Sequence, residues 1–205
     1  THDLSLDSYH GFWYLMQLFF NLKEFSQLDR VVQMMQEVGF GFTEDIWVLL
    51  MKVKALEGDS NGVEHLIQQA TSDDMALSSS MLNQLMRSLP VERVDEVKEF
   101  FKHRFNEEML NRDAETYEIL LERLYESKDY EGVAYFYADL LEHASQPPYF
   151  KPTDDIFLIA LKAARDNNFD IKTTEEIWSD MKKMDPRRKY HPDWKKPITM
   201  KDQRF

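Results

Sequence analysis

Residues 113–141 of the chain read DAETYEILLERLYESKDYEGVAYFYADLL. Apolar side chains recur every three or four residues in the first half and again in the second, which predicts two short amphipathic helices. Asp113 is the expected N-cap of the first helix, and Ser127-Lys128-Asp129 provides a polar break between the two. Helices this short cannot bury their apolar faces as an isolated pair. The stretch therefore predicts neighbours of the same kind elsewhere in the chain.

Helix pairs recur along the chain at a constant step of 35 residues. The residues expected to cap the first helix of each pair are Ser8, Thr43, Ser78 and Asp113, followed after 40 residues by Thr153. A fixed repeat of helix pairs is typical of an α-solenoid rather than a closed bundle. The sequence therefore predicts an all-α, right-handed solenoid of about five helix-turn-helix repeats.

The repeat domain is expected to span residues 1–184 and to be followed by a basic, non-helical tail over residues 185–205. Residues 1–6 are expected to form an incoming linker. On the first helices, Trp47, Tyr117 and Phe157 are expected to be buried between adjacent helices. The helices expected outside residues 113–141 cover residues 9–22, 25–38, 44–56, 62–71, 79–89, 91–105, 154–166 and 174–184.

The composition argues against most kinds of enzyme. The chain has no cysteine, which excludes disulfides, zinc–thiolate sites and thiol catalysis. Its six glycines form no phosphate-binding loop, and its six histidines have no metal-ligand spacing. No apolar run reaches the eighteen or so residues that a transmembrane helix needs. We therefore expect no catalysis, no metal or cofactor, no small-molecule substrate and no membrane insertion.

The net charge of −12 is unevenly distributed along the chain. Residues 182–205 carry nine Lys and Arg against three Asp, an excess of +6. The preceding residues carry sixteen basic against thirty-four acidic side chains, a balance of −18. The helical body should repel polyanions on average, whereas the tail should attract them.

The fourth repeat resembles the pentatricopeptide repeat family. Thr116-Tyr117 followed by Ile119-Leu120-Leu121 is similar to the Thr-Tyr-Asn-x-Leu-Ile opening of that repeat. Residues 129–133 resemble its turn into the second helix, and residues 136–141 resemble its Leu-Phe-x-x-Met close. The fifth repeat is a looser copy. Tetratricopeptide repeats, with a period of about 34 residues, are the alternative, but the small residues that they place at packing positions are missing.

The resemblance implies binding of single-stranded RNA in mitochondria or plastids, with one base read by a few side chains of each repeat. It places the first reading residue of each repeat at Trp13, Val48, Asn83, Glu118 and Leu158. The repeat-end residues are Thr43, Ser78, Asp113 and Thr153. Only Asn83 with Asp113 matches a combination common in the family, one associated with pyrimidines, notably uridine. Val48 and Leu158 cannot hydrogen-bond a base, so a tract that reads five bases is not expected.

Two groups of cations are candidates for contacts with phosphate. Lys52, Arg87 and Lys162 occupy the same place in three repeats, which predicts a basic ladder along one face. Glu122 and Gln17 occupy that place in the other two repeats, and ordinary solvated helix positions are the alternative interpretation. The second group lies in the tail, where aromatic side chains could stack on bases or anchor in a partner: Arg187, Arg188, Lys189, Tyr190, Trp194, Lys195 and Lys196. The alternative is a disordered tail that is basic only for solubility, or a tail that docks on the acidic helices of the same chain.

Together with these observations, the resemblance predicts a non-catalytic factor in organelle gene expression that binds RNA, including ribosomal RNA, or ribonucleoprotein or ribosomal partners, or both. The acidic body suggests that protein partners contribute much of the binding. The alternative is a protein-interaction scaffold with no RNA role. The chain begins with Thr and shows no targeting segment, so we expect a processed form or an excerpt. A mitochondrial location is implied by the resemblance alone.

Overall fold

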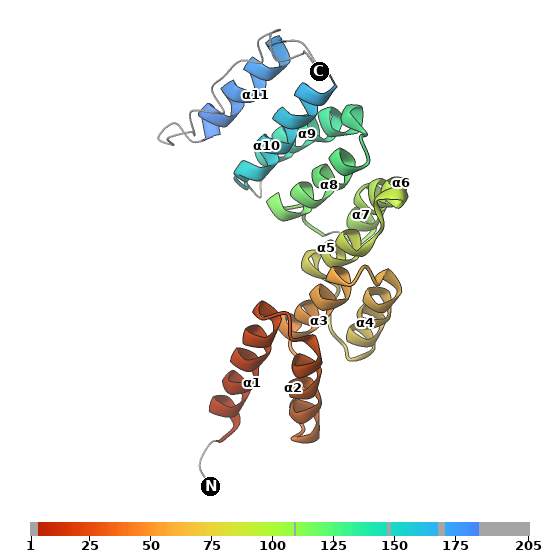
Figure 1. Ribbon diagram of the computed structural model, residues 1–205, viewed down its shortest axis with the longest axis vertical. Coiled ribbons are helices and arrows are strands. Elements are labelled where there is room, and N and C mark those ends of the chain that lie inside the picture. The colour runs from red at the N-terminus through yellow and green to blue at the C-terminus, as the bar shows by residue number, and fades with distance from the viewer. Residues whose placement is uncertain (1–3, 109, 147–148, 168–170, 185–205) are drawn as a thin grey trace. The chain divides into compact units, whose positions relative to one another are not determined.

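The computed structural model describes residues 4–108, 110–146, 149–167 and 171–184, and every regular element within these ranges is helical (Figure 1). This confirms the predicted all-α class for the described residues. The contacts between residues divide the chain into two units, Thr1–Leu89 (unit 1) and Pro90–Phe205 (unit 2). The predicted tail, residues 185–205, lies outside the described residues.

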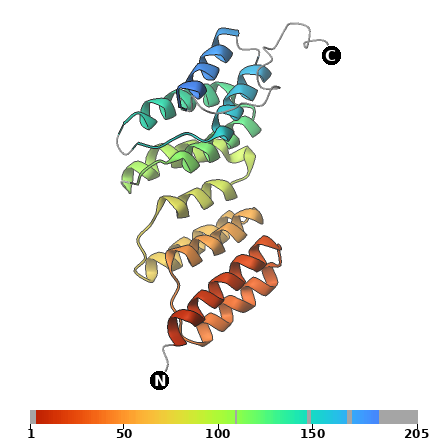
Figure 2. The ribbon, with the colours of Figure 1, turned by 90° about the vertical axis from the view of Figure 1, so that its left-hand side faces the viewer.

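Unit 1 is built from two helix pairs and a single helix. Its elements are α1 (Leu4–Asn21), α2 (Phe25–Glu37), α3 (Glu44–Leu56), α4 (Ser60–Ser72) and α5 (Ser79–Ser88). Helix α1 lies beside α2 (Figure 2), α3 packs on α4, and α5 packs on both α3 and α4. Met16 from α1, Leu28 from α2 and Ile46 from α3 are fully buried in one core cluster. Each helix pair therefore buries its apolar face partly against the next first helix.

Unit 2 repeats this arrangement with a more aromatic core. Its elements are the 3₁₀ turn Val91–Arg93, α6 (Val94–Glu99), the π-helical turn Phe100–Arg104, α7 (Phe105–Glu107), α8 (Ala114–Glu126), α9 (Tyr130–Ala144), α10 (Asp154–Asp166) and α11 (Ile171–Met184). Helix α8 pairs with α9 and α10 pairs with α11, while α10 also packs on α8 and α9. The ring of Phe101 lies 5.0 Å from that of Tyr117 and 5.3 Å from that of Phe136, both edge to face.

Four of the five predicted first-helix caps are correct. Asp113 forms a capping box with Thr116, accepting its backbone N–H at 2.9 Å. The Ser78 hydroxyl accepts the backbone N–H of Met81, and the Thr153 hydroxyl accepts that of Ile156. Thr43 also precedes its helix, α3, but without a side-chain capping bond. The starts of these helices therefore recur with the predicted spacing. Capping depends on residues close in sequence, so it can be predicted from the sequence.

Three helices begin earlier than the sequence predicted. Helix α1 begins at Leu4, so Ser8 lies inside it and residues 4–6 are not a linker. Nothing in this stretch stops a helix, since it contains neither Gly nor Pro. Helix α4 begins at Ser60, because the Asp59 carboxylate caps it by accepting the Gly62 N–H at 2.9 Å. Helix α11 begins at Ile171 rather than at residue 174.

The segment predicted as one regular helix over residues 91–105 is composite and extends to Glu107. It starts as a 3₁₀ turn and continues through α6, a π-helical turn and α7. The wider π turn accommodates two large side chains in the core, because Phe101 and Phe105 are both buried with ring centroids 6.3 Å apart. Periodicity alone cannot reveal such a change of helix type.

The predicted core aromatics are confirmed. Trp47, Tyr117 and Phe157 expose 4%, 0% and 2% of their surface. Trp47 packs edge to face on Phe42, while Phe157 packs in the same way on Tyr137. The first helices of both units are therefore held by large side chains that project from the same place in the repeat.

Candidate nucleic-acid interface

In the fourth repeat, the two places implied to read a base come together. Glu118 lies one turn into α8, and Thr153 lies 35 residues later, at the start of α10. The Thr153 hydroxyl donates a hydrogen bond of 2.6 Å to Glu118 Oε2. Both side chains are partly exposed. The structure thus presents a carboxylate and a hydroxyl as one polar group at this edge of unit 2.

The corresponding place in the first repeat is built differently. The hydroxyl of Thr43 lies 2.6 Å from the hydroxyl of Tyr9, so the repeat-end residue contacts α1 about one turn before Trp13. Trp13 itself is half-buried and packs against the apolar core of unit 1. Within unit 1, Val48 is also half-buried and offers no polar side-chain atom. These two repeats supply no base-reading amide or carboxylate.

Asn83 and Asp113, the pair that matched a family combination, belong to different units. Asn83 on α5 is fully buried, and within the described part of the chain neither polar atom of its side chain has a hydrogen-bond partner. Such a buried amide is costly to leave unpaired. Asp113 is exposed, and its Oδ1 accepts both the N–H and the hydroxyl of Thr116. Its carboxylate therefore serves first as the cap of α8.

The predicted basic ladder falls on neighbouring first helices within unit 1. Lys52 on α3 and Arg87 on α5 are half-buried, and these helices pack together. One guanidinium nitrogen of Arg87 lies 3.5 Å from the Gln84 side-chain oxygen. In unit 2, Lys162 is exposed on α10 while Glu122 is exposed on the adjacent α8. Each unit thus offers cations at this place, but in unit 2 a carboxylate accompanies the cation.

The tail cations lie outside the described residues. They are Arg187, Arg188, Lys189, Lys195 and Lys196, together with Tyr190 and Trp194. Their role in binding stays a prediction from the sequence.

Two hydrogen bonds between tyrosine and aspartate have no signal in the sequence. The Tyr117 hydroxyl donates to Asp139 Oδ2 at 2.7 Å, and the Tyr125 hydroxyl donates to Asp166 Oδ2 at 2.7 Å. Burial, followed by the bond to Asp139, raises the pKa of Tyr117 above its usual range. The bond to Asp166 raises the pKa of Tyr125. Both acceptors follow their donors by more than twenty residues, so no local pattern reveals the pairing.

An ion pair fixes α6 to the start of α9. The Lys98 ammonium lies 2.6 Å from Asp129, the residue that caps α9, and 2.9 Å from Asp95. The hydrogen bond to Asp129 raises the pKa of Lys98. Burial acts to raise the pKa of Asp129, but hydrogen bonds from Lys98 and from the Gly132 amide hold it below its usual range. This cation is therefore committed to structure rather than available to phosphate.

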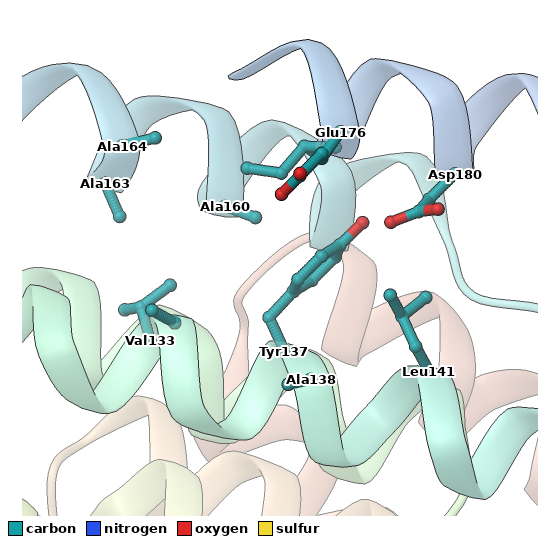
Figure 3. A pocket seen from close by; sticks show the side chains of 11 residues that line it. Val133, Tyr137, Ala138, Leu141, Ala160, Ala163, Ala164, Glu176 and Asp180 are labelled. Carbon is teal, nitrogen blue, oxygen red and sulfur yellow. The ribbon is translucent and has the colours of Figure 1, made fainter. Parts of the chain in front are cut away.

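A pocket of about 230 Å³ lies between α9, α10 and α11 (Figure 3). Its walls are mostly alanine and other aliphatic side chains, with the carboxylates of Glu176 and Asp180 on α11. The Tyr137 hydroxyl points toward Asp180 (Figure 3), although it has no hydrogen-bond partner within the described ranges. Burial and the Asp180 charge raise the pKa of Tyr137. The pocket is an apolar cleft with an acidic rim.

Unit 1 has a groove in the equivalent place, between the second helices α2 and α4. It encloses about 600 Å³ and includes Trp47, whose buried indole N–H has no hydrogen-bond partner among the described residues. Neither hollow is lined by a residue implied to read a base or by a cation of the predicted ladder. The hollows therefore lie on a different surface from the candidate RNA site, and no sequence pattern indicates either of them.

The described part of the chain contains neither a candidate metal-ligand cluster nor a candidate membrane span. Across these ranges, no group of His, Cys, Asp or Glu side chains could hold a metal ion. No helix in the same ranges is both long and apolar enough to span a bilayer.

Comparison with known proteins identifies the fold. No protein-family model and no curated protein matches the sequence. The chain is similar to the crystal structure of the PPR domain of Arabidopsis thaliana protein-only RNase P 1 in complex with tRNA. The TM-score is 0.61 at 12% identity, over 87% of this chain and 90% of that one.

The chain is also similar to the pentatricopeptide repeat protein PPR10 from maize. The TM-score is 0.56 at 14% identity, over 85% of this chain but only 24% of that one. At such identities the similarity establishes architecture. The chain has the fold of the pentatricopeptide repeat domains, as the sequence predicted.

Proposed function

We propose that this chain is a non-catalytic helical-repeat protein that binds single-stranded RNA through the surface of its first helices. The observation that carries the proposal is the fold: the chain matches, over 87% of its length, a repeat domain whose structure was determined with tRNA. Repeat proteins of this type bind extended ligands along the surface formed by equivalent positions of successive repeats.

The contacts at the first helices support this surface as the binding site. Thr153 and Glu118 form one polar group with hydrogen-bonding capacity beyond their mutual 2.6 Å bond. Lys52 and Arg87 stand at equivalent places on α3 and α5, which pack together. A strand of RNA lying across these two helices would meet two cations in succession. Recognition of individual bases would rest on few repeats, because Val48 and Leu158 have no polar side-chain atom.

Electrostatics sets the expected strength of binding. The residues before 182 carry a balance of −18, so phosphate is repelled on average by the helical body. The excess of +6 in residues 182–205 offsets part of that repulsion. We therefore propose that the tail contributes a large share of the affinity, while the helices position the strand.

We further propose a role in organelle gene expression, in mitochondria, together with ribonucleoprotein or ribosomal partners. This step rests on the resemblance of the repeats to the pentatricopeptide family. Locating a tagged form of the gene product in its own cells tests it, and a signal confined to the cytosol would contradict it.

A scaffold for proteins alone is the second candidate. It is favoured by the exposed apolar side chains on α1 and by the groove of about 600 Å³ on the second-helix side of unit 1. Both features suit protein contacts better than phosphate contacts.

The two candidates are separated by charge reversal on the first helices. In Lys52→Glu with Arg87→Glu, single-stranded RNA should bind at least about tenfold more weakly, since two phosphate contacts become repulsive. The matched control reverses Lys23 and Arg30, exposed cations of the same unit that lie outside its first-helix ladder. Fluorescence anisotropy with a labelled uridine-rich strand measures both. If both variants lost RNA affinity equally, the cations would act only through non-specific attraction of phosphate, which would contradict the proposed binding surface.

A further inference from the structure

Helix α1 exposes an apolar face to solvent. Tyr14, Leu15 and Leu18 are 72%, 44% and 50% exposed, and Leu22, just beyond the helix, is 60% exposed. Tyr14, Leu18 and Leu22 are spaced by four residues and Leu15 lies three before Leu18, which places them on one side of the helix. We name these four residues the outer face of α1. A contiguous apolar surface of this kind marks a place where another element packs.

Most of the places that correspond to Tyr14, Leu15 and Leu18 in later first helices are buried. One step of 35 residues carries Tyr14 and Leu18 to Leu49 and Val53 on α3, which are 3% and 5% exposed. On α5 and α10 the places of Tyr14, Leu15 and Leu18 are mostly buried as well: Gln84, Leu85, Ser88, Ala160 and Ala163. Leu50 and Ile159, at the places of Leu15 on α3 and Tyr14 on α10, are half-buried, and the place of Leu22 after α3 is the exposed Glu57. The outer face of α1 therefore exposes apolar side chains at places that are mostly buried in the later first helices.

For three first helices, α3, α5 and α10, the structure shows which helices pack on the face that corresponds to the outer face of α1. On α3, residues Ile46, Leu49 and Val53 form one cluster with buried side chains from both α1 and α2. Helix α5 packs on α3 and α4, and α10 packs on α8 and α9. In each case the cover is the pair of helices that comes just before in the chain. Two helices, not one, lie on each first helix.

We propose that the outer face of α1 is covered by one further helix-turn-helix unit, N-terminal to residue 1 on the same polypeptide. This unit packs on α1 as α1 and α2 pack on α3, with Leu, Met and Val side chains from both of its helices. The interface continues the series that the chain already contains. A second copy pairing α1 with α1 would place only one helix on each face, unlike the interfaces within the chain.

The last described helix, α11, has the polar surface of a helix that faces water. The exposed described side chains of α11 are polar or charged: Glu175, Glu176, Ser179, Lys182 and Lys183. Helix α11 is therefore suited to face water, and α1 is not. A further unit packed on α1 explains why α1 exposes apolar side chains whereas α11 exposes polar ones.

A single cysteine tests the proposal, because residues 1–205 contain none. Leu18→Cys is placed in this chain and in the gene product as its own cells make it. Each protein reacts with a maleimide under native conditions. Mass spectrometry then measures how fast the peptide that contains residue 18 becomes labelled. Val53→Cys is the buried control at the equivalent place, and Glu64→Cys is the exposed control on α4.

We expect residue 18 to label at least about tenfold more slowly in the gene product than in the 1–205 chain, because a packed interface opens rarely. Residue 64 should label equally fast in both, and residue 53 slowly in both. Equal labelling of residue 18 in the two proteins would overturn the proposal. Protection that vanishes on dilution, or on removal of co-purifying proteins, would assign the cover to a second copy or to another protein and would also overturn it.

Discussion

Helices α1 and α8 occupy the same place in two repeats but meet different surroundings. Leu15 on α1 is 44% exposed, whereas Leu120, three steps of 35 residues later on α8, is fully buried. Within unit 2, α8 is packed by α6, α9 and α10. The difference teaches that an apolar side chain on a repeat helix stabilises the fold only when a neighbouring element covers it.

The largest expected effect contrasts two tyrosines. Tyr117→Ala should lower the free energy of unfolding by about 3 kcal/mol or more, since it removes a fully buried ring in contact with Phe101 and Phe150. Tyr14→Ala on the outer face of α1 should change it by less than about 0.5 kcal/mol. Urea unfolding followed by circular dichroism measures both. A similar decrease in the two variants would show that α1 is as tightly packed as α8.

A smaller effect isolates the polar end of Tyr117. Tyr117→Phe keeps the ring and removes the bond to Asp139, which should cost about 1 kcal/mol. Because the folded state raises the pKa of Tyr117, its contribution to stability is complete below pH 10 or so and declines as pH rises further. The parent chain should therefore lose stability above that pH more steeply than the Phe variant. Parallel urea midpoints across this range would contradict the assigned pKa shift.

The smallest effect concerns the ion pair between α6 and α9. Lys98→Met should cost about 1 kcal/mol or less, since the pair is partly exposed. The lowered pKa of Asp129 gives a contribution that is present above its ordinary range near pH 4 and is lost as pH falls through the lowered value. Lys162→Met, an exposed site on α10, is the control. If the two variants have the same free energy of unfolding at pH 7, the ion pair contributes nothing to stability.

Much of the backbone could be predicted because its signals are local. Caps such as Asp113 and Thr153 act on amides three residues away, so their spacing reveals the repeat. The beginnings of α1 and α11 could not be placed in this way, since a helix extends until something stops it. The π turn at Phe100–Arg104 was not predicted because no sequence period distinguishes it from an α-helix.

The site was less predictable than the fold. The bond between Thr153 and Glu118 is consistent with the repeat step, since the resemblance places both residues at reading positions. The complete burial of Asn83 did not follow, because it depends on side chains far away in sequence. The bonds from Tyr117 and Tyr125 to aspartates and the two hollows also arise only when helices pack together. Local sequence patterns do not contain that information.

Salt-dependent RNA binding tests the proposed function most directly. The affinity for a single-stranded RNA is measured over a range of salt concentrations for residues 1–205 and for the same chain ending at residue 184. We predict that the shorter chain binds more weakly and has a flatter salt dependence, with the slope falling by about 0.7 for each phosphate that the protein no longer neutralises. Equal affinity and slope would show that the tail takes no part in RNA binding. If neither chain binds RNA, the proposed function is contradicted and the protein scaffold takes its place.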